Sequence, residues 1–348
     1  MKKLLVFILI LCLSLSCFAG CGSSDDDELV LAHFVYNFSD AQQNAVMNAA
    51  KILYEESGIS YTFYDGAGTQ SVQNDQISNA IQTGVDMLVV GMADVSSGQV
   101  VVDMAVKEGI PILFYNQQPA DDVVNSYDQC WFVGSDARGG GVMQGEMAAA
   151  LILEDYDAYD RDGDGVIQYV MIRSDLSHAE ANGRTEGSVT TVNELLTAAG
   201  YPEVEQMGTD YLADDWSANK GKEQMSIFLT ANPVSSTDGV ELIFCNNDSI
   251  AVGAISALQE VGFNISGGSN TVPIFGVDAT DEAVTYIDAG TMAGSAGQDP
   301  ELIATYVTTV ALNVLNGGEP LDGTDWTFET GTKNIFFPYS PYPEDLLG

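Results

Sequence analysis

The chain has 348 residues and carries 11 Lys and Arg against 50 Asp and Glu, which gives a formal net charge of −39 at pH 7. This acidity excludes nucleic acid as a partner, because too few basic side chains are present to neutralise phosphates. Hydrophobic residues make up 46% of the sequence, and the acidic residues are spread along it. We therefore interpret the charge as a self-repelling surface on a folded chain whose length suits two domains.

The N-terminus has the organisation of a secretory signal peptide. Two lysines precede an apolar run over residues 4–13, and small residues follow before Cys21. The tetrapeptide Phe-Ala-Gly-Cys at 18–21 has the form of a lipobox, which predicts a lipoprotein with Cys21 acylated at its mature N-terminus. The alternatives are cleavage without lipidation and acylation at Cys17.

This interpretation assigns residues 1–20 to the signal peptide and residues 21–28 to a polar tether. No later segment is long and apolar enough to cross a bilayer. We therefore expect an extracytoplasmic protein that is held at the cell membrane by its lipid anchor only.

From residue 29 onward, short apolar runs alternate with amphipathic stretches. The apolar runs predict strands at 29–36, 59–65, 86–92, 110–116, 130–136, 167–173, 204–208, 240–246, 271–278 and 292–297. The stretches between them predict helices at 40–57, 71–83, 96–108, 137–154, 179–199, 215–231, 248–262 and 299–316. Continuous apolar strands separated by helices indicate parallel sheets covered on both faces, so the fold class is α/β with right-handed crossovers.

The repeated units form two similar groups, which predicts two lobes with a change near residue 136. Polar residues follow strands of both groups: Asn116, Asp136, Asn247, Asp278 and Gln298. In open α/β sheets, ligands bind beyond the carboxyl ends of the strands. Any one of these residues could instead cap a helix or make a turn, but together they predict a polar cleft between the lobes.

Two cysteines lie within the predicted folded region. Cys130 and Cys245 are in or beside apolar runs, which favours buried free thiols over a disulfide.

The stretch DRDGDGVIQY, residues 160–169, begins like the calcium loop of an EF-hand. Its ligand positions are filled in order by Asp160, Asp162, Asp164, the backbone carbonyl of Val166, and Gln168. The last position needs a bidentate Glu, and Met171 stands there. Either the stretch is a solvated acidic turn, or its final ligand comes from elsewhere in the chain.

Taken in order, a set of motifs resembles the periplasmic galactose- and glucose-binding proteins of sugar ABC transporters, within the ribose-type group. The motifs are QNDQI (73–77), FYNQQP (114–119), DRDGDGVIQY (160–169), HAEANGR (178–184), the isolated Trp216, CNNDSIAVGA (245–254) and FGVDA (275–279). The resemblance covers nearly the whole mature chain. It implies two Rossmann-like lobes of the periplasmic binding protein type I, joined by a three-segment hinge with crossings near Asp136, Asp299 and Thr332.

On this resemblance the first lobe would hold residues 29–136 plus 299–332, and the second lobe 137–298 plus 333–348. In this family the last ligand of the calcium loop comes from a distant strand, at the position that matches Glu241. The resemblance therefore implies a structural Ca²⁺ ion bound by Asp160, Asp162, Asp164, Val166, Gln168 and Glu241. This set supplies seven oxygens, within the range of about six to eight that Ca²⁺ takes.

The resemblance also implies a sugar site, in which planar polar groups bind hydroxyls and an aromatic ring covers a C–H face. The implied residues are Asp40, Asn116, His178, Glu180, Arg184, Trp216, Asn247, Asp278 and Gln298. Taken singly, several have simpler interpretations. Glu180 and Arg184 could be a helix-surface pair, Asn247 a helix cap and Trp216 a core residue.

The sequence departs from the family pattern at several of these positions. Glu180 stands where the family usually has Asp, Gln298 where it has Asn, and Gln117 where Lys is common. In the loop after the first strand, ungapped spacing places Ser39 and Ala41 at the expected carboxylate and aromatic positions, whereas a small shift recruits Asp40 and Phe38. We favour Asp40 and leave the stacking residue of 37–41 open. These changes leave room for a ligand other than glucose or galactose.

The implied function is a solute-binding lipoprotein that captures a monosaccharide by hinge closure and delivers it to an ABC permease. The alternative is a sensor that presents the bound sugar to a chemoreceptor or histidine kinase. We expect a monomer, and we expect no enzyme, because the chain contains no phosphate loop, nucleophile elbow or H-E-x-x-H motif. Paired carboxylates that hydrolyse glycosides remain the enzymatic alternative.

Overall fold

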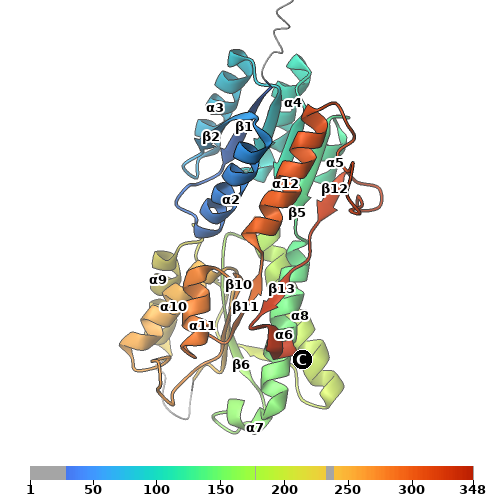
Figure 1. The fold of residues 1–348 in the computed structure, drawn as a ribbon. Helices are drawn as coiled ribbons and strands as arrows, with labels where there is room; N and C mark the ends of the chain where they lie inside the picture. The colour runs from blue at the N-terminus through green and yellow to red at the C-terminus, as the bar shows by residue number, and fades with distance from the viewer. Residues whose placement is uncertain (1–28, 177, 233–238, 348) are drawn as a thin grey trace, which may run out of the picture.

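The computed structural model describes residues 29–176, 178–232 and 239–347. Within these residues the chain forms two lobes, each built around one β-sheet, which lie one above the other in Figure 1. The signal peptide, Cys21 and the polar tether, all predicted within residues 1–28, lie outside the described residues.

The first lobe contains a six-stranded parallel sheet with the strand order β12-β5-β4-β3-β1-β2. Its strands are β1 (Val30–Val35), β2 (Ser60–Asp65), β3 (Met87–Val90), β4 (Ile112–Tyr115), β5 (Cys130–Gly134) and β12 (Asn334–Phe336). Its helices are α2 (Ala41–Ser57), α3 (Gln70–Thr83), α4 (Gly98–Glu108), α5 (Asp121–Asn125) and α12 (Pro300–Leu315), with a 3₁₀ turn, η1, at Val95–Ser97.

Both faces of this sheet are apolar and covered. Leu31 of β1 belongs to a buried cluster with residues of α2 and α12, whereas Phe34 belongs to a cluster with residues of α3 and α4. Successive strand residues point to opposite faces, so a strand covered on both sides needs a continuous apolar run. This arrangement confirms the predicted α/β class.

The second lobe contains a seven-stranded sheet with the order β13-β11-β10-β9-β6-β7, in which β8 also pairs with β6. Its strands are β6 (Gln168–Arg173), β7 (Glu205–Gln206), β8 (Tyr211–Leu212), β9 (Leu242–Cys245), β10 (Ile274–Asp278), β11 (Gly294–Gly297) and β13 (Ser340–Tyr342). Only β13 runs antiparallel to its neighbour among these described pairs.

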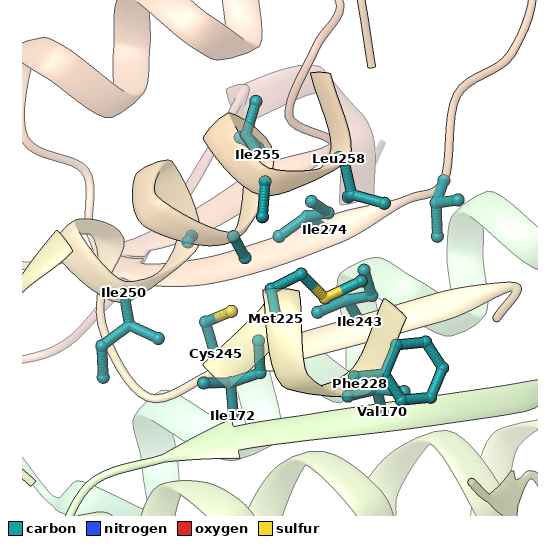
Figure 2. Close-up of a cluster of buried hydrophobic side chains, with 14 of the residues drawn as sticks. Val170, Ile172, Met225, Phe228, Ile243, Cys245, Ile250, Ile255, Leu258 and Ile274 are labelled. Carbon is teal, nitrogen blue, oxygen red and sulfur yellow. The ribbon is translucent and has the colours of Figure 1, made fainter. Parts of the chain in front are cut away.

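Helices again cover both faces of the second sheet. They are α6 (Ala137–Glu154), α7 (Tyr156–Tyr159), α8 (Ala179–Ala199), α9 (Ala218–Ala231), α10 (Asp248–Glu260) and α11 (Asp281–Asp288), and a short 3₁₀ turn, η2, ends the lobe at Glu344–Leu347. Figure 2 shows side chains of β6, β9 and β10 packed against α9 and α10 on one face. Residues of α6 and α8 pack against the other face.

Over the residues that the structure describes, the chain crosses between the lobes three times: between β5 and α6, between β11 and α12, and between β12 and β13. The expected third crossing near Thr332 is wrong by a few residues. β12 pairs in parallel with β5, with Asn334 opposite Phe132, so residues 334–336 belong to the first sheet. A three-residue strand gives too short a sequence pattern to recognise, and pairing with β5 decides its place.

One hydroxyl group joins all three crossings. The Oγ atom of Ser135 lies 2.9 Å from Oε1 of Gln298 and 2.7 Å from Oη of Tyr339, within hydrogen-bond distance of both. The three residues stand at the first, second and third crossing in turn. These bonds hold the crossing segments together at the side of the molecule where the lobes meet.

Helices α6 and α8 pack closely through glycines. A Cβ atom at Gly141 would lie 2.1 Å from the carbonyl oxygen of Arg184, and one at Gly187 would lie 2.5 Å from the carbonyl oxygen of Arg138. Any larger residue at either position would force the helices apart. Glycine therefore sets the position of α8, and with it the position of Arg184.

Two further expectations concern the described residues. Cys130 and Cys245 are buried and unpaired, as predicted, since they lie in strands of different sheets. No helix in the described part of the chain is long and apolar enough to span a membrane.

Candidate ligand site between the lobes

A cavity lies between the lobes, beyond the carboxyl ends of the strands. The first lobe contributes Tyr36, Asp40, Gln42, Gln43, Asn116 and Gln117, and the second contributes Glu180, Arg184, Trp216, Asn247 and Asp278. About 320 Å³ of space here is free of protein atoms, part of it open to solvent. The structure thus brings together most of the residues that the sequence singled out, from segments far apart in the chain.

Three of the lining residues have backbone angles that side-chain-bearing residues rarely adopt. The φ values of Asn116, Trp216 and Asp278 are 65°, 61° and 113°. Such left-handed conformations store strain and cluster at functional sites. Each of these residues lies where the chain turns out of a strand or into a helix, and the turn directs its side chain towards the cavity.

Arg184 provides the positive charge of the cavity. Its side chain is buried, pairs with Glu180 one helical turn earlier, and donates from Nη1 to the carbonyl oxygen of Asn246 at 2.8 Å. Burial alone would lower the pKa of Arg184, but Glu180, Tyr339 and Asp278 outweigh burial and raise it. The guanidinium also lies 5.7 Å from the centre of the Trp216 ring, within reach of a cation–π contact.

The carboxyl group of Asp278 is buried in the cavity lining, in the same lobe as Arg184. Burial raises its pKa well above the ordinary value, and Arg184 partly offsets that rise. Gln298 donates to Asp278 Oδ1 at 2.9 Å and accepts from Gln42 Nε2 at its backbone oxygen. Gln298 is not among the residues that line the cavity. It lies behind Asp278 and links the two lobes, whereas the sequence placed it against the ligand.

Asp40 lines the cavity as the N-cap of α2. Its Oδ1 accepts from the backbone N–H of Gln43 at 2.8 Å, and its Oδ2 accepts from the hydroxyl of Tyr36. Burial raises the pKa of Asp40 above its ordinary value. Neither Phe38 nor Ala41 lines the cavity, so the aromatic residue that this loop contributes is Tyr36.

Tyr36, Gln42 and Gln43 line the cavity but were not predicted from the sequence. Gln42 and Gln43 are 6% and 2% exposed in the first turn of a helix that otherwise buries apolar residues. Two consecutive glutamines shortly after the candidate carboxylate Asp40 were the available signal. Glutamine is common on helix surfaces, however, so the pattern alone does not separate a surface turn from a lined cavity.

Asn247 and His178 have structural contacts besides their places near the cavity. Asn247 Oδ1 accepts from the N–H of Ile250 as the cap of α10, and Nδ2 donates to the carbonyl oxygen of Trp216. His178 packs edge-on against Trp216, with ring centres 5.2 Å apart, and lines a neighbouring cavity. Burial lowers the pKa of His178, so its ring is neutral at pH 7.

Some buried polar atoms in this cavity have no hydrogen-bond partner among the described residues. They are Oε1 of Gln43, Oε1 of Gln117 and Nε of Arg184. A buried polar atom without a partner costs about 1–3 kcal/mol. Two acceptors and one donor left open in one cavity indicate a ligand that both donates and accepts hydrogen bonds.

Another buried carboxyl group, that of Asp248, lies behind the cavity lining. Its Oδ2 accepts from the N–H of Thr280 at 2.7 Å and its Oδ1 from the hydroxyl of Ser295 at 2.6 Å. Ser295 Oγ in turn accepts from the N–H of Ala279 at 2.9 Å. These bonds hold the turn that follows Asp278, in which Ala279 has φ 52°. Asp248 therefore positions Asp278 without lining the cavity.

The acidic loop at 160–169 lies beside Glu241, the residue that the resemblance implied as its last ligand. Oxygen atoms of Asp160, Asp162 and Glu241 lie within 4.8 Å of one another. Glu241 accepts from the N–H groups of Arg161 and Gln168, so its carboxylate faces the loop. The parallel pairing of β6 with β9, with Tyr169 opposite Leu242, brings this residue beside the loop.

The candidate metal ligands of this loop are all oxygen atoms. Its side chains offer oxygen atoms, and the buried Oε1 of Gln168 has no partner among the described residues. Burial raises the pKa of Glu241, while the backbone N–H groups that it accepts from lower it. A set of carboxylate and amide oxygens with one acceptor left open fits a hard cation such as Ca²⁺.

Comparison with known proteins places the chain among binding proteins. A family model described as a periplasmic binding protein domain matches residues 30–319. The D-galactose/methyl-galactoside binding periplasmic protein of Haemophilus influenzae is 30% identical over 312 residues, which cover 90% of this chain and 87% of that protein.

Solved structures share the fold. A solute-binding protein of an ABC transporter from Bacillus halodurans with bound myo-inositol has a TM-score of 0.72 and 23% identity, covering 92% of this chain and 96% of that one. Another from Clostridium phytofermentans, with bound β-D-glucose, has a TM-score of 0.72 and 18% identity, covering 90% and 92%.

The buried carboxyl of Asp248 predicts a specific pH dependence of stability. Burial raises its pKa to about 7, so the folded protein keeps a proton that the unfolded chain releases from about pH 4 upward. This contribution to the free energy of unfolding is present below pH 4 and is lost as the pH rises towards 7. In Asp248→Asn it is absent. Urea unfolding from pH 4 to 8 should therefore show the wild type losing stability relative to this variant.

Asp214→Asn, at an exposed aspartate, is the control for removing one negative charge from the second lobe. The raised pKa of Asp248 is contradicted if the difference in unfolding free energy between wild type and Asp248→Asn stays constant as the pH rises. It is also contradicted if that difference changes in favour of the wild type.

Proposed function

The chain belongs to the periplasmic binding protein family, and from this premise we propose that it binds a galactose- or glucose-like monosaccharide between its lobes and delivers it to an ABC transporter. The single observation that carries the choice of ligand is the set of open hydrogen-bonding atoms in the cavity: Oε1 of Gln43 and Gln117, and Nε of Arg184. Sugar hydroxyls both donate and accept, so a monosaccharide could satisfy all three.

The other lining residues suit the same ligand. The carboxylates of Asp40, Glu180 and Asp278 accept from hydroxyls, and Asn116 and Asn247 offer amides. Trp216 supplies a flat apolar surface for the C–H face of a sugar ring. The relative from Haemophilus influenzae is described as a galactose and methyl-galactoside binding protein, which supports this class of ligand.

The proposed mechanism is capture by closure of the lobes. Residues of both lobes line one cavity, so a ligand that contacts both favours the arrangement in which they are close. The transporter would then recognise the closed form. Members of the family bind their ligands and do not transform them, and this chain is likewise a binding protein and not an enzyme. The sensor alternative and the monomeric state stay predictions of the sequence.

Sugar binding is tested with Trp216→Ala and calorimetric titration of D-galactose and D-glucose. Loss of the stacking surface should weaken the binding of the preferred sugar by about 30-fold, which corresponds to roughly 2 kcal/mol. Trp326→Ala is the matched control, because Trp326 stacks on Tyr306 in the first lobe, outside the cavity. Failure of the wild type to bind either sugar, or equal losses in both variants, would contradict the proposal.

We also propose that the loop at 160–169 holds a structural Ca²⁺ ion through Asp160, Asp162, Asp164, the Val166 carbonyl, Gln168 and Glu241. The ion would neutralise carboxylates that otherwise repel one another, and it would tie the loop to β9. All of these residues belong to the second lobe, so the ion would stabilise that lobe without contacting the sugar.

Removal of the ion should lower the melting temperature of the sugar-free protein. EGTA should cause the fall and added Ca²⁺ should reverse it, since an ion bound only by the folded chain stabilises the fold. Calorimetric titration of Ca²⁺ should show at least about tenfold weaker binding for Asp162→Asn, which removes an exposed ligand. Glu203→Gln, at an exposed residue of the same lobe, is the control. An EGTA-treated wild type with an unchanged melting temperature would exclude the site.

We further propose that acylation of Cys21 anchors the protein at the cell membrane. In a bacterial host that processes lipoproteins, the wild type should partition with membranes, and Cys21→Ser should leave the membrane fraction. Cys17→Ser distinguishes the alternative acceptor and should stay with the membranes. Immunoblots of the fractions measure this, and membrane association of Cys21→Ser equal to that of the wild type would refute the proposal.

A further inference from the structure

A second, larger cavity opens directly beside the proposed sugar site. It has about 1180 Å³ of space free of protein atoms, part of it open to solvent, against about 320 Å³ in the first cavity. Asn116 and Glu180 line both cavities, one from each lobe. The two cavities therefore adjoin at these residues, and a ligand in the first lies next to the second.

The wall of the second cavity is largely apolar. Val95, Pro119 and Ala120 contribute to it from the first lobe, and Ala137 and Ala179 contribute from the second. Ala120 and Ala179 are exposed on opposite lobes across this space. An apolar surface shared by two lobes that close on one another favours a ligand group with an apolar face.

The wall also carries three carboxylates and one guanidinium: Asp121, Asp136, Glu180 and Arg138. Asp121 Oδ1 accepts from Gln118 Nε2 at 2.9 Å and from Asn334 Nδ2 at 2.8 Å. Arg138 lies 3.7 Å from Glu186. Asp136 Oδ1 accepts from the N–H of Arg138 at 3.0 Å, and Glu180 pairs with Arg184. The excess of carboxylates on this wall disfavours an anionic group, and the apolar part of the wall favours a neutral one.

One buried polar atom of the wall has a free hydrogen-bonding position. Nδ1 of His178 is buried and has no hydrogen-bond partner among the described residues, and His178 packs against Trp216 of the sugar site. Its ring therefore stands between the surface that would stack on the sugar and the second cavity. A neutral imidazole nitrogen at that place can donate to or accept from an oxygen that joins two parts of a ligand.

We propose that the second cavity is a subsite for the O-linked substituent of a glycoside, so that the protein's ligand is a sugar ring that carries a neutral second ring. The inference rests on the proposed function, because it places the first ring in the Trp216 cavity. It goes beyond that function by naming a ligand larger than a monosaccharide. The first cavity is small, so a second ring finds its space in the neighbouring one.

The test compares D-galactose and D-glucose with their α- and β-phenyl glycosides and with lactose, by calorimetric titration. At least one of these extended ligands should bind at least about tenfold tighter than its parent sugar, because its second ring leaves water for an apolar wall. A gain with a phenyl glycoside indicates an apolar aglycone, and a gain with lactose indicates a second sugar ring.

Ala179→Trp fills the second cavity from an exposed position at the start of α8. It should abolish the gain of the extended ligand and leave the affinity for the parent sugar within about twofold. Ala198→Trp, near the other end of the same helix and also exposed, should leave both affinities unchanged.

The outcomes separate the two proposals. If a parent sugar binds and no extended ligand binds tighter, the subsite is refuted and the sugar site stands. If Ala179→Trp weakens the parent sugar and the extended ligand equally, the second cavity does not hold the substituent. If neither the sugars nor the extended ligands bind, the proposed function fails and the subsite fails with it.

Discussion

The cavity depends on one buried guanidinium group. Arg184 is the cation near the buried carboxyl groups of Asp248 and Asp278 and the half-buried ones of Asp40 and Glu180. Its charge lowers the pKa of Asp40, Asp248 and Asp278 against the larger effect of burial. Without such a cation, carboxylates gathered at this depth would repel one another and take up protons. The packing of α8 on α6 through glycine backbone is therefore more than a detail of the fold, because it places this charge.

The parts of the fold that long sequence patterns encode could be predicted. The continuous apolar strands and the long helices follow from burial on both faces of a sheet, and each appears where the pattern predicts it. The short elements could not be predicted, because a few residues carry too little periodicity. They are α5, α7, α11, β8, β12 and β13. β12 exists because β5 offers it a partner, and that pairing is invisible in residues 334–336 alone.

The candidate site likewise contains residues that could be predicted from the sequence and residues that could not. Asn116, Asn247 and Asp278 could be predicted because polar residues that end buried strands are conspicuous. Gln42 and Gln43 could not, since glutamine on a helix is ordinary and only the packing of the lobes buries it. Gln298 was assigned to the ligand, whereas the structure places it behind Asp278, where it hydrogen-bonds across the crossings. Sequence position alone does not distinguish a residue that lines a cavity from one that supports it.

The hydrogen bonds of Ser135 suggest how the two lobes could move relative to each other while the cavity between them stays ordered. Ser135, Gln298 and Tyr339 lie at the three crossings, and the hydroxyl of Ser135 is close to both partners. A rotation of one lobe about the crossing segments changes distances least near its axis, so these bonds can persist while the far side of the cleft opens. Asp278 hydrogen-bonds to Gln298, which carries one of them. The second lobe's most deeply buried cavity carboxyl is therefore tied to the axis itself, and closure would bring the first lobe's Asp40 and Asn116 towards a carboxyl that is already in position.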